Sequence, residues 1–205
     1  MTTPARLDPL LAQYDWSVER LVRRLSGPTS DSGDGDPVPI PVLTDEEYHW
    51  EPVPDCWSIR PKPQGPASGA TVLVGAGEWG RDGGRPRPYP PPMTTISWRL
   101  GHLSEMLTLR ADWTVGSHTL TQQDYVARGI ATNGIAALEQ GAAAWREALS
   151  AGDDEVLDHV GHSTYPDGSD SEEPFIRVVW WVNQEVLHHG AEIALLRDLY
   201  RARRT

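Results

Sequence analysis

The chain has 205 residues, a single cysteine and a formal net charge of −11. This length supports one domain with its own core, and we treat residues 1–205 as one domain. The lone Cys56 excludes an internal disulfide. The negative charge disfavours nucleic-acid binding, because phosphate backbones repel an acidic chain. No signal peptide is evident, and no segment approaches the roughly 20 apolar residues of a membrane span, so we expect a soluble, cytoplasmic protein.

The first predicted element is an amphipathic helix over residues 7–25, where apolar residues recur at steps of three and four. Gly27 and the proline after it end this helix. A polar connector rich in proline and glycine follows over residues 30–42. Thr44 and Glu47 then have the spacing of a capping box, which predicts a short helix.

Residues 50–92 contain most of the prolines, which excludes a long helix and limits any strand to a short or irregular one. Loops beyond about 15 residues are uncommon inside a domain unless they are functional or disordered. This segment also carries Trp50, Trp57 and Trp79. We therefore expect a long, irregular loop that packs on the rest of the domain.

Helical periodicity returns over residues 94–115, 133–150 and 173–203, with a short helical piece at 153–160. Together with the first helix, these segments make four substantial helices, and no alternating strand pattern is evident. The predicted fold is therefore an all-α four-helix bundle, with the Pro/Gly-rich loop between its first and second long helices. In such bundles, sites are built from inward-facing side chains of neighbouring helices.

The last predicted helix carries a pair of side chains that suit a metal ion. Glu185 and His189 are four residues apart, so both project from one face of the helix. Gln184 and His188 form a rival pair with the same spacing, and periodicity does not choose between them. His102 is a candidate third ligand, because it lies within an otherwise apolar helical face.

Three segments resemble the DinB-like superfamily of metal-binding four-helix bundles. They are DCWSIRP at 55–61, ISWRLGHLSEM at 96–106 and NQEVLHHGAEIALLRDLY at 183–200. The resemblance covers about residues 5–203. It implies a bundle with one histidine ligand in the second long helix and a pair of ligands in the last.

Matching this ending to the family's pattern implies the metal ligands His102, Glu185 and His189, with glutamate where many relatives have a histidine. That set is similar to the one in mycothiol-dependent maleylpyruvate isomerases of the same superfamily. Two nitrogens and one oxygen suit Zn²⁺ best, with Ni²⁺ or Fe²⁺ as alternatives, and leave room for water or substrate.

The resemblance implies a metal-dependent enzyme, a thiol-dependent transferase or isomerase acting on a small molecule. Mycothiol is the expected co-substrate, since the arginine- and tryptophan-rich composition favours an actinobacterial source. A metal-coordinated thiol is deprotonated at neutral pH, which makes this chemistry reasonable. The rival interpretation is a non-catalytic, stress-associated metal-binding or scaffold bundle. A homodimer formed through helix faces suits either interpretation.

Four further residues have interpretations of their own. We expect Cys56 to be a buried structural thiol, because no group that would lower its pKa is evident. Trp57 is expected in the core, and Arg60 is expected to bond carbonyls or a carboxylate. Glu105 lies one turn from His102. It either supports the site by hydrogen bonding to a ligand residue or lies on a solvated face of the helix.

Overall fold

The computed structural model describes residues 4–27 and 41–204. Its elements in chain order are α1 (Asp8–Ser26), α2 (Asp45–Tyr48), β1 (Ile59–Pro61), a 3-10 turn η1 (Lys62–Gln64), β2 (Val72–Val74), β3 (Trp79–Gly83), α3 (Ile96–Val115), α4 (Ala131–Ser150), α5 (Asp154–Asp158) and α6 (Phe175–Ala202). Most of the predicted connector at 30–42 lies outside the described residues.

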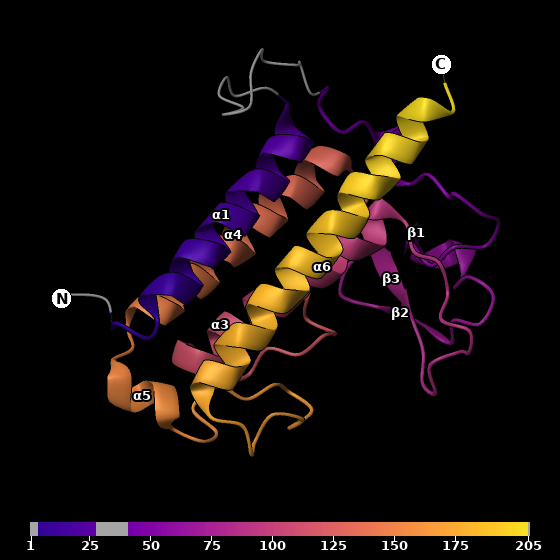
Figure 1. Cartoon of the computed structure of the whole chain (residues 1–205). Coiled ribbons are helices and arrows are strands. Elements are labelled where there is room, and N and C mark those ends of the chain that lie inside the picture. Colours follow the sequence, from indigo (N-terminus) through magenta and orange to yellow (C-terminus); the bar gives the residue numbers. More distant parts are fainter. Residues whose placement is uncertain (1–3, 28–40, 205) are drawn as a thin grey trace, which may run out of the picture.

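The four long helices form a bundle in which α1 and α3 each pack against both α4 and α6 (Figure 1). This confirms the predicted all-α bundle. A continuous apolar core fills the space between the helices, because each helix turns its apolar face inward. Its fully buried members include Leu25, Leu100, Leu103, Leu107, Leu138, Trp145, Phe175, Val179, Val182 and Ile193.

The ends of the long helices lie within two residues of their predicted positions. The Thr95 hydroxyl caps α3 by accepting a hydrogen bond from the backbone N–H of Trp98, at 3.2 Å. Pro174 occupies the N-cap position of α6, where its missing N–H costs no intrahelical hydrogen bond. No helix in the described part of the chain is both long and apolar enough to cross a membrane.

The capping box predicted around α2 forms only in part. The Thr44 hydroxyl accepts a hydrogen bond from the Glu47 backbone N–H at 3.2 Å, as predicted. The Glu47 carboxylate does not reach back to Thr44 and instead accepts hydrogen bonds from Arg197 on α6, at 2.7 and 3.1 Å. Both side chains are almost fully buried, so each supplies the charge that the other requires.

The loop between α1 and α3 contains a small antiparallel sheet, with strand order β1-β3-β2, on one side of the bundle (Figure 1). Its strands are three to five residues long, within the predicted limit of short strands. The sheet itself was not predicted. The strands are too short, and β3 reads WGRDG, so the sequence shows no alternating pattern.

The sheet is held together by a buried carboxylate. Asp82 accepts hydrogen bonds from the backbone N–H groups of Ser58 (2.8 Å) and Ala67 (2.9 Å), and from Arg60 Nε at 2.9 Å. The Asp82 backbone carbonyl in turn accepts a hydrogen bond from the indole N–H of Trp98, at 2.8 Å. These bonds fix the sheet against the first turn of α3, one helical turn before His102.

Candidate metal centre

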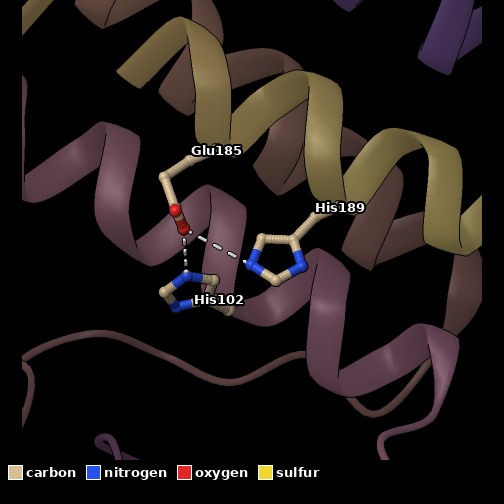
Figure 2. Close-up of side chains that lie close together, drawn as sticks. All are labelled: His102, Glu185 and His189. Atoms are coloured by element: carbon tan, nitrogen blue, oxygen red, sulfur yellow. Dashed lines mark hydrogen bonds and ion pairs between the residues drawn. The ribbon is translucent and has the colours of Figure 1, made fainter. Parts of the chain in front are cut away.

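The three predicted ligands lie together where α3 and α6 cross. His102 projects from α3, while Glu185 and His189 project from successive turns of α6 toward it (Figure 2). The two helices run antiparallel at this point, because Arg99 contacts Glu192 whereas Arg110, further along α3, contacts Trp181.

The donor atoms of these side chains converge. Glu185 Oε2 lies 3.3 Å from His102 Nε2 and 3.4 Å from His189 Nε2, and all three donor atoms are within 4.8 Å of one another. With ligand distances of about 2.0–2.1 Å, neighbouring ligands of a tetrahedral Zn²⁺ are about 3.3–3.4 Å apart. Both contacts of Glu185 therefore fit the spacing that such an ion requires, and two imidazoles with one carboxylate are residue types that bind a divalent ion.

The protonation of these groups also suits a cation. Burial lowers the pKa of His102 to about 4, so its imidazole is neutral at pH 7. Burial by itself raises the pKa of Glu185, but hydrogen bonds and charge interactions with both histidines outweigh it and hold the pKa well below its usual range. The centre thus presents a neutral imidazole and a carboxylate at neutral pH.

A second carboxylate orients His189. Glu192 Oε2 lies 2.7 Å from His189 Nδ1, and because a carboxylate can only accept, Nδ1 carries the proton. In the neutral imidazole with Nδ1–H, Nε2 carries the lone pair that a cation between Nε2 and Glu185 Oε2 would accept. Arg99 Nη1 lies 3.4 Å from the same Nδ1, but it also contacts Glu192 Oε2, so both nitrogens donate to one oxygen. Carboxylates hold metal-binding histidines in this way.

The other side of the centre is formed by Trp98 and Arg81. The Trp98 ring stacks on His102, with centroids 5.3 Å apart and 24° between the planes. The Arg81 guanidinium lies 5.1 Å from the Trp98 centroid and is bonded to Glu105. Arg81 passes over Gly101, where a Cβ would lie 3.5 Å from Arg81 Cδ and 2.7 Å from Ile59 Cδ1. The absence of a side chain at Gly101 thus allows the sheet to pack closely beside His102.

The rival pair faces away from the centre. Gln184 and His188 are exposed on α6. His188 Nε2 lies 3.2 Å from Glu192 Oε1, on the outer side of the carboxylate that orients His189. His188 does not belong to the group of converging histidine and carboxylate donor atoms found among the described residues. The choice between the two pairs therefore follows from which side of α6 meets α3.

The other residues singled out in the sequence lie around the sheet. Cys56 and Trp57 are buried, and burial raises the pKa of the Cys56 thiol. Arg60 binds the carboxylates of Glu51 and Asp82, so it has the structural role expected for it. Glu105 is buried, and its carboxylate is bonded to Arg81.

Three residues of the centre were not anticipated as functional. Glu192 lies three positions after His189, a spacing that places both on one helical face and could have indicated the contact. Arg99 lies three positions before His102, so this spacing likewise places both side chains on one face of α3. Arg81 belongs to a strand without any sequence pattern, so no local signal could have brought it to the centre.

The protein is thus a helical bundle in which two histidines and a carboxylate form a group that could hold a metal ion. The family model of the DinB superfamily matches residues 41–193. The chain therefore belongs to the DinB superfamily. Comparisons with curated proteins and with solved structures found no match.

Proposed function

We propose that the protein binds one divalent metal ion through His102 Nε2, Glu185 Oε2 and His189 Nε2, with Zn²⁺ as the first candidate. The convergence of these three donor atoms from two helices is the observation that carries the proposal. Support comes from Glu192, which fixes the tautomer of His189 so that a lone pair faces the ion. Ni²⁺ and Fe²⁺ suit the same donor set.

The proposed function is a thiol-dependent transferase or isomerase reaction on a small molecule, with mycothiol as the expected thiol. A bound divalent ion would lower the pKa of a coordinating thiol and present it as thiolate. Three protein ligands leave a position for that thiol. Two neutral imidazoles and one carboxylate leave a net positive charge on a divalent site, which favours an anionic fourth ligand.

Metal analysis tests this proposal. We expect the purified protein to take up Zn²⁺ or Ni²⁺ in a 1:1 ratio, as measured by dialysis and elemental analysis. His102→Ala and His189→Ala should each abolish this uptake, because two remaining ligands hold the ion weakly. Adding mycothiol to Co²⁺-loaded protein should produce a sulfur-to-cobalt charge-transfer band.

His188→Ala is the matched control, since it removes a neighbouring histidine on the exposed side of α6. It should retain wild-type stoichiometry. The metal assignment is wrong if wild type takes up no stoichiometric ion, or if His188→Ala loses the ion while His189→Ala keeps it. A metal-loaded protein that gives no band with mycothiol would contradict the thiol part alone.

Glu192→Gln should weaken Zn²⁺ binding by about 10–100-fold, the usual effect of losing a residue that hydrogen-bonds to a metal ligand. The amide is a weaker acceptor than the carboxylate, so Nδ1–H is held less firmly and the imidazole is a poorer donor. Competition with a chromophoric chelator measures the affinity. Unchanged affinity would show that Glu192 does not orient His189.

A further inference from the structure

Several buried polar atoms next to the metal centre have no hydrogen-bond partner in the described part of the chain. They include Trp57 Nε1 and Arg81 Nε, both on residues whose side chains lie against Trp98. A buried polar atom without a partner costs free energy, and in native proteins it usually marks a water or ligand. Both of these atoms are N–H donors that cannot accept, so the missing partner is an acceptor.

Arg81 is held firmly in place by its neighbours. Its Nη2 makes both hydrogen bonds to Glu105, at 2.9 and 2.8 Å, and its guanidinium lies beside the ring of Trp98. The side chain is only 7% exposed. The ion pair with Glu105 leaves Nε–H and the two Nη1 N–H groups for another partner.

The location of Arg81 connects these free donors with the metal centre. Arg81 crosses α3 at Gly101, adjacent to His102, and Glu105 lies one turn further along the helix. Trp98, against which Arg81 lies, stacks on His102. Arg81 and His102 thus contact the same indole ring, with Arg81 Cζ 5.1 Å and the His102 ring centroid 5.3 Å from the centroid of Trp98.

We propose that Arg81 is a substrate-binding residue that recognises a carboxylate on the small molecule bound beside the metal. The proposal rests on the proposed function and adds the substrate class. A guanidinium offers paired, charged N–H donors that match carboxylate oxygens, and Glu105 pre-orients it without using those donors. Glu105 already compensates the charge of Arg81, so the preference for a carboxylate over an uncharged acceptor comes from the stronger, paired hydrogen bonds that a charged acceptor makes with a guanidinium.

Two buried arginines of α3, Arg99 and Arg110, also have side-chain nitrogens without a hydrogen-bond partner among the described residues, but their guanidinium groups have other neighbours. Arg99 Nη1 is bonded to Glu192. Arg110 lies between the rings of Tyr165 and Trp181, at 4.8 and 5.1 Å, and is paired with Asp170. Arg81 has one aromatic neighbour instead of two and lies beside His102, so it is the residue we assign to ligand recognition.

The test compares small thiols that differ only in charge. Co²⁺-loaded protein is titrated with mercaptoacetate and 3-mercaptopropionate, and with the amide of each, and the sulfur-to-cobalt band gives the affinities. The two chain lengths sample two separations between the thiol sulfur and the carboxylate. We expect at least one acid to bind about tenfold or more tightly than its amide, because a charged hydrogen bond contributes more than a neutral one.

The variant Arg81→Met/Glu105→Leu should reduce that preference, the ratio of acid affinity to amide affinity, to near unity; its Co²⁺ uptake is measured in parallel. Both partners are replaced because Arg81→Met alone leaves the Glu105 carboxylate buried and unpaired, which threatens folding. The matched control is Arg197→Met/Glu47→Leu, which removes another buried pair with an unpartnered nitrogen, far along α6. It should keep the wild-type preference.

The outcomes separate the two proposals. Equal affinity of wild type for acids and amides, or a preference that survives in the Arg81→Met/Glu105→Leu variant, overturns the role of Arg81 and leaves the metal centre intact. A Co²⁺ site that gives no band with any of these thiols overturns that role together with the thiol chemistry. Failure to take up Co²⁺ overturns the proposed function itself.

Discussion

We expect Glu185→Gln to lower the affinity for Zn²⁺ at least about a hundredfold, more than the 10–100-fold that follows the loss of a residue that only hydrogen-bonds to a ligand, such as Glu192. The substitution removes the negative charge at the centre and replaces a carboxylate oxygen by a weakly donating amide. Glu185 Oε2 is also the atom that both histidines approach. Competition titrations with a chromophoric chelator at fixed pH and salt measure the change.

Glu185→His is the informative counterpart, because it restores a third histidine of the kind common in DinB-like proteins. It should hold Zn²⁺ in a 1:1 ratio, whereas Glu185→Gln should not do so at the same free Zn²⁺ concentration. The double variant Glu185→Gln/His188→Ala should behave like Glu185→Gln, since His188 lies on the exposed side of α6. Wild-type affinity in Glu185→Gln would remove Glu185 from the ligand set.

We expect Arg197→Met to lower the free energy of unfolding by about 3–5 kcal/mol, the usual effect of removing one partner of a buried ion pair. The side chains of Arg197 and Glu47 are 1% and 4% exposed, so the remaining carboxylate would stay buried without its main partner. Arg197 also donates to the backbone carbonyl of Pro41 at 2.7 Å. Urea unfolding of metal-free protein, followed by circular dichroism, measures the loss without a contribution from metal binding.

The double variant Arg197→Met/Glu47→Leu should recover most of that loss, because apolar side chains of similar volume can replace a buried ion pair at little net cost. Arg146→Met breaks the exposed pair with Asp15 and should cost less than about 1 kcal/mol. If the double variant is as unstable as Arg197→Met alone, the unpaired Glu47 carboxylate is not the cause of the instability.

The sequence by itself determined the helices and one part of the centre. Apolar residues at helical spacing predicted the four long helices, because a helix must turn one stripe of side chains toward the core. The spacing of four residues also put Glu185 and His189 on one face of α6. These are local properties of the chain, so they can be inferred from the sequence without knowledge of the tertiary contacts.

Periodicity left open which pair faces α3, since Gln184 and His188 have the same spacing; the resemblance to the DinB-like superfamily implied Glu185 and His189, and in the tertiary structure these two face α3. The tertiary structure also brought His102, 83 residues earlier than Glu185 in the chain, within 3.3 Å of the Glu185 carboxylate. Arg81 reached the centre through a sheet of strands too short to show a sequence pattern. In each case the deciding contact joins residues far apart in the chain, and local periodicity carries no information about such contacts.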